Sequence, residues 1–379
     1  MTLKVMIVDD SALYRQLVKN TLRNVPDVQV IGLASTGLEA LAKIPELQPD
    51  LLTLDVQMPD MNGLELLREI KKRRFGVKAI MLSSLTAQGA QVTTDALLAG
   101  AFDFIQKPNS NDAETNRKLL DELLSEKIKA FRESRSISMP ARKIVDAVPR
   151  PIEWKSNVDA EYPLTDTAVA SVKKNPTTSP AKPSRIDAVI IGTSTGGPLA
   201  LREVIPKLPR TLGVPVFVVQ HMPPGYTKSL AARIGEISSL PMQEAANNMI
   251  VEPNRVYLAP GGLHMGIENQ RGRCIISTSD LPPEHNCRPA VNYTLRSAVQ
   301  AYSSHLLVVI LTGMGRDGTE GCRLVRQHGG SVLAQHPDGC VVYGMPKAVV
   351  EEQLANRVVP LEKMATWIVR LVEASRIAS

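Results

Sequence analysis

The first 130 or so residues alternate short apolar runs with longer stretches of helical periodicity. The apolar runs predict strands at residues 4–8, 28–34, 50–55, 78–83 and 102–106. Apolar positions spaced three or four residues apart predict helices between them, for example over 11–23 and 63–72, and a long helix over 113–131 ends the unit. This alternation is typical of a parallel sheet with helices on both faces.

The pattern changes after this unit and then returns. Residues 132–185 carry scattered prolines and no sustained apolar period, so we interpret them as a linker, semi-stiff where prolines cluster. From 186 onward we expect strands near 187–191, 215–220, 255–259, 306–312 and 331–335. We expect helices near 197–207, 226–238, 288–302, 318–328, 345–354 and 361–374. The sequence therefore predicts two doubly wound parallel-sheet α/β domains, 1–131 and 186–379, joined by the linker 132–185.

Composition narrows the possible functions. A net charge of +6 is mild for 379 residues, and an aromatic content of 4% leaves few stacking platforms, so nucleic-acid binding is not favoured. No apolar run is long enough to span a bilayer, and Asp9 and Asp10 interrupt the N-terminus before a signal-peptide core could form. We expect a cytoplasmic protein that is not inserted in a membrane. The four cysteines are far apart in sequence, and we expect buried or idle thiols.

Polar residues end several strands of the first unit. These are Asp9, Asp10, Asp55, Ser83 and Lys107. Because the carboxyl ends of parallel strands border one crevice, these side chains should converge. Three adjacent carboxylates repel one another unless a divalent cation and the lysine ammonium neutralise them, and Mg²⁺ suits such hard oxygen ligands. A carboxylate placed there can attack a phosphoryl donor and form an aspartyl phosphate.

Four stretches of this unit resemble a bacterial response-regulator receiver domain: 5–11, 54–63, 83–84 and 106–108. The resemblance implies a flavodoxin-like fold in which Asp55 is phosphorylated, with a chemotaxis histidine kinase as phosphoryl donor. It implies that Mg²⁺ is held by Asp10, Asp55 and the Gln57 backbone carbonyl, assisted by Asp9. It also implies that Ser83 and Lys107 contact the phosphoryl oxygens and that Phe104 reorients on phosphorylation.

The second unit presents a serine in a glycine-rich turn directly after a strand. Ser194 lies between Gly192 and Gly197, and a hydroxyl so placed is a candidate nucleophile that needs a base and a group to orient the base. His221 and Asp317 follow two later strands. His336 also follows a strand and competes for the role of base. His221 is favoured because its strand comes next after that of Ser194, and right-handed crossovers place consecutive strands side by side.

Two other interpretations of the glycine-rich turns remain open. Gly192-x-Ser194-x-Gly196 has the spelling of the α/β-hydrolase nucleophile elbow, although that fold orders its triad serine, acid, histidine. The stretch 313–318 has the spelling G-x-G-x-x-G, with Asp338 about twenty residues on, which is the dinucleotide-binding pattern. We rank dinucleotide binding below hydrolysis, because Asp317 would repel phosphates in such a turn and Ser194 and His221 would have no role.

Residues 191–198, 219–223, 258–262 and 311–318 resemble the catalytic domain of the chemotaxis protein-glutamate methylesterases. With the receiver in front, the resemblance implies a Rossmann-like serine hydrolase regulated by phosphorylation. It implies demethylation of glutamate γ-methyl esters on chemoreceptors with release of methanol, and deamidation of receptor glutamines, without a cofactor in the catalytic domain. Ser194 would attack, His221 would act as base, Asp317 would orient it, and Thr195 and Met314 are oxyanion candidates.

The resemblance further suggests that the unphosphorylated receiver covers the cleft near Ser194.

Two other functions of the second unit remain as alternatives. The second unit could be a phosphorylation-dependent binding module without activity, although the intact serine, histidine and aspartate oppose this. A DNA-binding output would require a small helix-turn-helix domain, which the α/β pattern does not provide.

Overall fold

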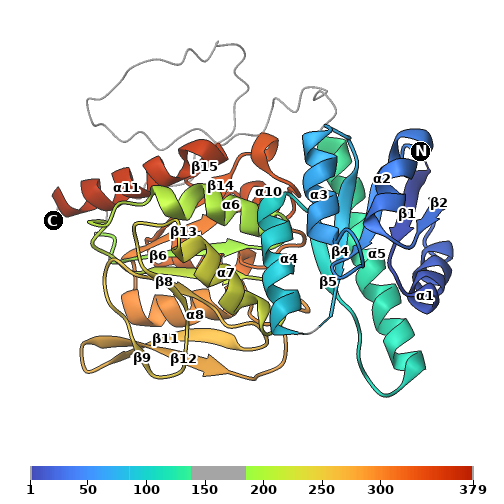
Figure 1. Ribbon diagram of the computed structural model, residues 1–379. Coiled ribbons are helices and arrows are strands. Elements are labelled where there is room, and N and C mark those ends of the chain that lie inside the picture. Colours follow the sequence, from blue (N-terminus) through green and yellow to red (C-terminus); the bar gives the residue numbers. More distant parts are fainter. Residues whose placement is uncertain (1, 85, 138–184, 378–379) are drawn as a thin grey trace, which may run out of the picture.

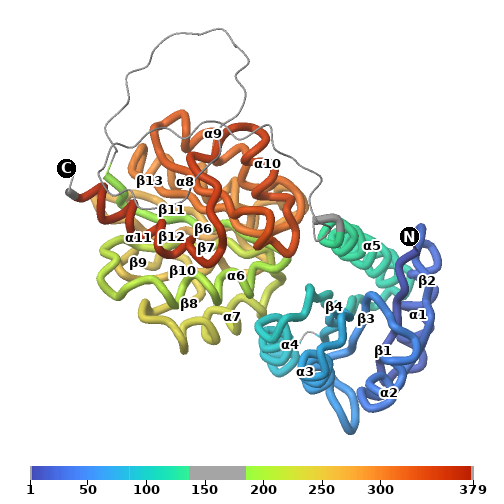
Figure 2. Tube along the Cα trace, turned by 90° about the horizontal axis from the view of Figure 1, so that it is seen from above, coloured from blue at the N-terminus to red at the C-terminus, as the bar shows by residue number. Residues whose placement is uncertain are grey.

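The computed structural model describes residues 2–84, 86–137 and 185–377 and contains two α/β units (Figure 1). The first unit has a five-stranded parallel sheet in the order β2-β1-β3-β4-β5, the flavodoxin-like order. Its strands are β1 (Leu3–Val8), β2 (Val28–Ala34), β3 (Leu51–Asp55), β4 (Lys78–Ser83) and β5 (Asp103–Gln106). Its helices are α1 (Ala12–Arg23), α2 (Gly37–Leu47), α3 (Gly63–Lys72), α4 (Ala87–Ala99) and α5 (Ala113–Ile137). Helices α1 and α5 pack together, and α2, α3 and α4 form the second layer (Figure 2).

The second unit contains a seven-stranded parallel sheet in the order β15-β14-β13-β6-β7-β10-β8. Its strands are β6 (Ala188–Thr193), β7 (Val216–Gln220), β8 (Met242–Glu244), β10 (Val256–Leu258), β13 (Leu306–Ile310), β14 (Ser331–Gln335) and β15 (Arg357–Val359). Its α-helices are α6 (Gly197–Val204), α7 (Tyr226–Gly235), α8 (Val291–Tyr302), α9 (Thr319–Gln327), α10 (Met345–Glu351) and α11 (Leu361–Ile377). The fold class predicted from sequence, two parallel-sheet α/β domains, is confirmed.

A small antiparallel sheet in the order β11-β12-β9 lies beside the large one and was not predicted. Its strands are β9 (Met249–Ile250), β11 (His264–Gln270) and β12 (Arg273–Ser279). In β11 the first four residues are buried and the last three are exposed, so the strand shows neither an apolar run nor strict alternation. The edge strands β8 and β15 were also missed, because three residues are too few to show a period.

Helix α5 extends six residues beyond the predicted end at 131. Its last turns are held against the segments before β2 and β3. The Arg132 guanidinium donates to the carbonyl of Pro26, and Arg135 pairs with Asp50 at 2.6 Å. These contacts explain why a segment without a strong apolar period is helical. Of the predicted linker, residues 132–137 are therefore helical, and 138–184 lie outside the described residues.

The two units pack against each other through α4, which contacts α6 and α7 (Figures 1 and 2). The Phe104 and Tyr226 rings lie 4.5 Å apart between centroids. Arg233 on α7 pairs with Asp95 on α4 at 2.8 Å, and Arg202 on α6 donates to the Leu98 carbonyl at 2.6 Å. The contact thus combines a buried aromatic pair with charged groups around it.

The turn between β6 and α6 is tight because glycines remove the side chains that would crowd it. Gly196 has φ +80°, a left-handed conformation that glycine adopts without strain. A Cβ on Gly197 would lie 1.9 Å from Gln220 Oε1 and 2.6 Å from Thr193 Oγ1. The Gln220 amide needs this space, since it donates to the carbonyls of Ser194 and His221 at 3.0 and 3.1 Å. The turn therefore fixes the backbone of both residues.

We expect Gly197→Ala to lower the thermal unfolding midpoint of the full chain, because the new methyl must displace the buried Gln220 amide. Overpacking of this kind costs about 1–3 kcal/mol. Differential scanning calorimetry checks the shift, with Gly76→Ala as control because no atom lies within 4 Å of its Cβ position. Equal midpoints for the two variants would contradict the packing argument.

Candidate active site

Three neighbouring strands of the large sheet carry the predicted catalytic residues at their carboxyl ends. The order β13-β6-β7 places Asp317, Ser194 and His221 on adjacent strand ends, Asp317 coming from the loop before α9. The expected adjacency of β6 and β7 is confirmed by their parallel pairing. The convergence follows from the fold, since carboxyl ends of parallel strands share one edge.

The His221 and Asp317 side chains form a buried ion pair. His221 Nε2 lies 2.8 Å from Asp317 Oδ2, and the side chain of Asp317 is only 2% exposed. The carboxylate also accepts backbone N–H groups from Val291 at 2.6 Å, Asn292 at 3.0 Å and Gly318 at 2.8 Å. Burial alone would raise the pKa of Asp317, but these hydrogen bonds and the His221 ring lower it. Asp317 is thus held as an anion that orients the ring.

Ser194 lines one small cavity together with His221. The cavity volume is about 10 Å³, at the lower limit for one water molecule. Its walls include receiver residues from α4 to β5, among them Phe102, Asp103 and Phe104. Within the described residues the Ser194 hydroxyl forms no hydrogen bond, and its backbone N–H donates to the Thr312 carbonyl at 3.0 Å. The structure therefore brings the serine and the histidine to one cavity without a hydrogen bond between them, and the receiver closes it.

The second ring nitrogen of His221 faces a cysteine. His221 Nδ1 lies 3.3 Å from Cys287 Sγ. Burial disfavours the charged ring, but the Cys287 sulfur and the Asp317 carboxylate outweigh burial and raise the pKa of His221 to about 10. Cys287 was expected to be an idle thiol, and no spacing in the sequence pointed to this contact. It was missed because the contact joins residues 66 positions apart.

The competing interpretations lose support in the structure. His336 follows β14, which pairs with β13 and β15 and not with β6, and its side chain is 41% exposed. In the G-x-G-x-x-G stretch, Gly318 N–H donates to the Asp317 carboxylate, so this amide is not available to a phosphate. His221 is thus the histidine that shares a cavity with the serine.

The oxyanion candidates lie on two segments that adjoin Ser194. Thr195 follows it directly, and its hydroxyl donates to the receiver's Asp103 at 2.6 Å. Met314 follows Gly313, whose Cβ position would lie 2.8 Å from Ser194 Cβ. Both backbones thus adjoin the serine, and their role as donors stays a prediction.

The receiver unit carries the predicted acidic pocket. Carboxylate oxygens of Asp9, Asp10 and Asp55 all lie within 4.8 Å of one another. Lys107 Nζ lies 2.8 Å from Asp9 and 2.9 Å from Asp55. Burial raises the pKa of Asp55 to about 6 even though Lys107 opposes it. Clustered hard oxygen donors of this kind suit Mg²⁺, because one lysine offsets only one of the three carboxylate charges.

Two further residues of the predicted phosphorylation site are Gln57 and Ser83. The Gln57 backbone N–H lowers the pKa of Asp55 by hydrogen bonding, so Gln57 adjoins the phosphoacceptor. The Ser83 hydroxyl accepts from Thr93 at 2.7 Å, so in this state it contacts α4. Burial raises the pKa of Tyr226 in the catalytic unit, and a hydrogen bond with the Ser83 side chain partly offsets this rise. Ser83 therefore also adjoins Tyr226.

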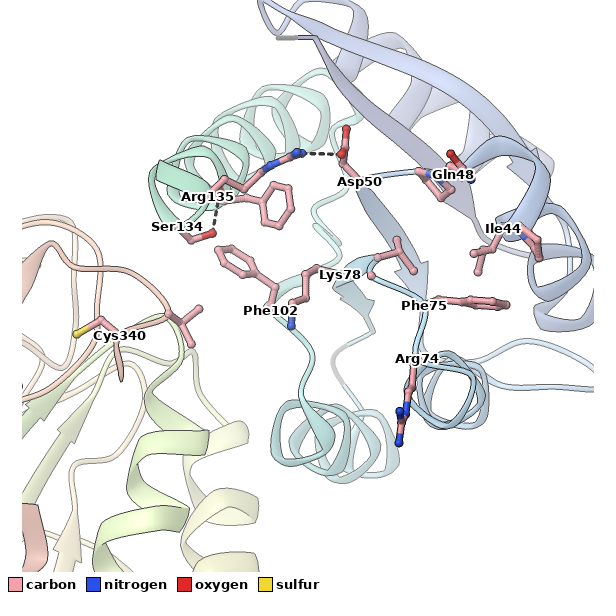
Figure 3. A pocket seen from close by; sticks show the side chains of 16 residues that line it. Ile44, Gln48, Asp50, Arg74, Phe75, Lys78, Phe102, Ser134, Arg135 and Cys340 are labelled. Carbon is pink, nitrogen blue, oxygen red and sulfur yellow. Dashed lines mark hydrogen bonds and ion pairs between the residues drawn. The ribbon is translucent and has the colours of Figure 1, made fainter. Parts of the chain in front are cut away.

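A second, much larger cavity lies elsewhere (Figure 3). It measures 830 Å³ and is bordered by Phe75, Phe102 and Arg135 of the receiver and by Cys340 of the catalytic unit. Asp50 and Lys78, at the amino ends of β3 and β4, also line this cavity. Because both reaction centres lie at carboxyl ends of strands, this cavity belongs to neither.

The fold and site define a class: an α/β unit with a candidate serine-hydrolase site, on which a receiver with an acidic pocket is packed. The response regulator receiver domain model matches residues 5–120, and the CheB methylesterase model matches residues 189–368. Over 98% of both chains, the sequence is 42% identical to the protein-glutamate methylesterase/protein-glutamine glutaminase of Thermotoga maritima. It is 39% identical to the enzyme so named from Desulfotalea psychrophila, over 98% of this chain and 99% of that one. The chain belongs to the protein-glutamate methylesterase/protein-glutamine glutaminase family.

No helix among the described residues combines the length and apolar character needed to cross a bilayer.

We expect Asp317→Asn to lower the pKa of His221 from its value of about 10, because the substitution removes the anion that favours the charged ring. The ring would then lose its proton at lower pH. Histidine NMR titration of the full chain measures this, since only six histidines contribute signals. Asp187→Asn is the control: Asp187 pairs with His305 at 3.0 Å and not with His221, so the His221 titration should not move. An unchanged His221 titration in Asp317→Asn would contradict the assignment.

Proposed function

We propose that this chain hydrolyses glutamate γ-methyl esters on the cytoplasmic helices of chemoreceptors, releasing methanol, and deamidates specific receptor glutamines. Ser194 is the nucleophile, His221 the base and Asp317 the group that orients the base. The observation that carries the proposal is the buried His221–Asp317 ion pair beside Ser194. The family membership supplies the substrate class, and the protein acts in the cytoplasm without nucleic acid.

The contact between His221 and Asp317 supports one particular nitrogen for the proton transfers. Nε2 of His221 is engaged by Asp317, so Nδ1 is the atom that can accept the Ser194 proton. Ser194 Oγ then attacks the ester carbonyl, and the imidazolium returns the proton to the departing methoxide to give methanol. Water, deprotonated by the same nitrogen, releases the acyl group as glutamate and restores the serine. With a glutamine substrate, ammonia leaves in place of methanol.

The tetrahedral intermediate carries an oxyanion that requires donors. The backbone N–H of Thr195 and the backbone at Met314 supply them, because both segments adjoin Ser194. Such donors stabilise charge that develops only in the transition state.

We expect Ser194→Ala to abolish methanol release from methylated receptor membranes while the protein remains folded. His221→Ala should reduce the rate by at least about a thousandfold, since base and nucleophile act as one unit. A serine-directed phosphonate should label Ser194 in the unsubstituted chain. His336→Ala is the matched control, and if it silenced the enzyme while His221→Ala did not, the base would be misassigned.

The receiver regulates this site by covering it. The Asp103 carboxylate accepts the hydroxyl of Thr195, the residue after the nucleophile, and Lys127 holds Asp103 from the receiver side at 3.0 Å. Phe104 packs on Tyr226, and the cavity at Ser194 is too small for a glutamyl ester side chain. This arrangement supports an inactive docked state.

Phosphorylation at Asp55 weakens the docked state. A histidine kinase of the chemosensory system donates the phosphoryl group. Asp9, Asp10, Asp55 and the Gln57 carbonyl would hold Mg²⁺, which would supply neutralising positive charge when bound. Ser83 and Lys107 then contact the phosphoryl oxygens. Because Ser83 and Phe104 both adjoin Tyr226, movement of either one disturbs the contact with α7.

We expect Asp95→Asn to raise methanol release by the unphosphorylated full chain by about threefold to fivefold. The substitution removes the Asp95–Arg233 pair, and a partly exposed pair contributes up to about 1 kcal/mol to docking. Glu252→Gln is the control, since Glu252 pairs with Arg255 inside the catalytic unit. Asp55→Asn should keep the low rate with a phosphoryl donor present. Equal rates for Asp95→Asn and the unsubstituted chain would count against docking through this face.

A further inference from the structure

A second side chain, besides that of Asp317, contacts the base. Cys287 Sγ lies 3.3 Å from His221 Nδ1, the only ring nitrogen that Asp317 leaves for the Ser194 proton. The hydroxyl of Ser194 makes no hydrogen bond within the part of the chain that the structure describes, although it borders the same cavity as the ring. The sulfur therefore occupies the position on the ring that the mechanism requires for the serine.

The loop before α8 holds Cys287 in a defined place. Glu284 and Cys287 exchange backbone hydrogen bonds of 3.1 and 2.8 Å across a two-residue turn. The turn residues His285 and Asn286 have φ values of 50° and 61°, as in a tight type I′ turn. The paired backbone leaves the cysteine little freedom to move away from the ring.

Helix α8 anchors this turn from two sides. The Arg296 guanidinium pairs with Glu284, and the Asn292 amide lies 3.1 Å from His285 Nε2. The backbone N–H of Asn292 also donates to Asp317. The same helix terminus thus places the aspartate on one ring nitrogen and the cysteine on the other.

We propose that Cys287 is a positioning residue of the hydrolase, whose sulfur holds His221 Nδ1 and competes with Ser194 for it. This inference rests on the proposed role of His221 as the base. Nδ1 points at one partner at a time, whether it donates or accepts, so its contact with the sulfur and its contact with the serine hydroxyl are mutually exclusive. Catalysis requires the ring to exchange the sulfur for the hydroxyl.

The competition has an electrostatic consequence. Two titratable side chains face the ring, Asp317 from the loop before α9 and Cys287 from the loop before α8, and both raise the pKa of His221. The receiver's Asp103 faces Thr195 instead. A protonated ring cannot accept the serine proton, so the rate rises with pH as His221 loses its proton. Removing the sulfur should lower this pKa and move the acid limb of the rate profile to lower pH.

The test measures methanol release by the phosphorylated full chain as a function of pH. We expect Cys287→Ala to increase kcat/KM at neutral pH by about threefold or more and to move the acid limb of the profile to lower pH. Cys287→Ser should share the shift of the limb, because the sulfur that raises the pKa of His221 is gone. It should not exceed the unsubstituted rate at high pH, because its hydroxyl still competes for Nδ1. Cys274→Ala, at a partly buried cysteine on β12 of the small sheet, is the control and should change neither property.

A second measurement observes the contact without turnover. In ¹⁵N-histidine NMR of the unphosphorylated full chain, Cys287→Ala should move the His221 Nδ1 signal, and Ser194→Ala should leave it nearly unchanged. The inference is overturned if Cys287→Ala leaves both the signal and the pH profile unmoved. It is also overturned if the alanine variant is slower and serine restores the rate, because the sulfur would then assist the base. Either result leaves the proposed function intact if Ser194→Ala still abolishes methanol release.

Discussion

The site depends on one buried ion pair, that between His221 and Asp317. The carboxylate has almost no contact with solvent, so its charge is stabilised by the ring and by three backbone N–H groups. Those amides belong to the start of α8 and to the turn before α9, and their positions follow from the packing of both helices on the large sheet. Removing either partner would leave an uncompensated buried charge, which is far more costly than losing a surface pair.

Regulation and catalysis are joined through short physical contacts. On the receiver side, Ser83 and Phe104 adjoin the phosphoacceptor sheet edge and also Tyr226 at the start of α7. On the catalytic side, Thr195 is bonded to Asp103 and lies next to the nucleophile. In the proposed mechanism, a local change at the phosphoacceptor pocket alters access to Ser194 by releasing one packed face, without any rearrangement of the catalytic sheet.

Most of the fold could be predicted because its strands are buried on both faces and appear as continuous apolar runs. The predicted strand 78–83 and helix 63–72 have the observed bounds. The small antiparallel sheet could not be predicted, since half of β11 is exposed and its pairing depends on β12 across a turn. The last turns of α5 were missed for a related reason: they are held by contacts to Pro26 and Asp50, distant in sequence.

The sequence by itself determined which chemical groups stand at the strand ends, because a polar residue after an apolar run marks the point where a buried strand reaches the sheet edge. That is why Ser194, His221, Asp317 and the acidic receiver pocket were recognisable. Tertiary structure alone decided which nitrogen of His221 faces Asp317, that Cys287 holds the other, and that Asp103 reaches Thr195. These contacts join residues from 66 to 96 positions apart, and they depend on loop conformation and domain packing, which leave no periodic signal in the chain.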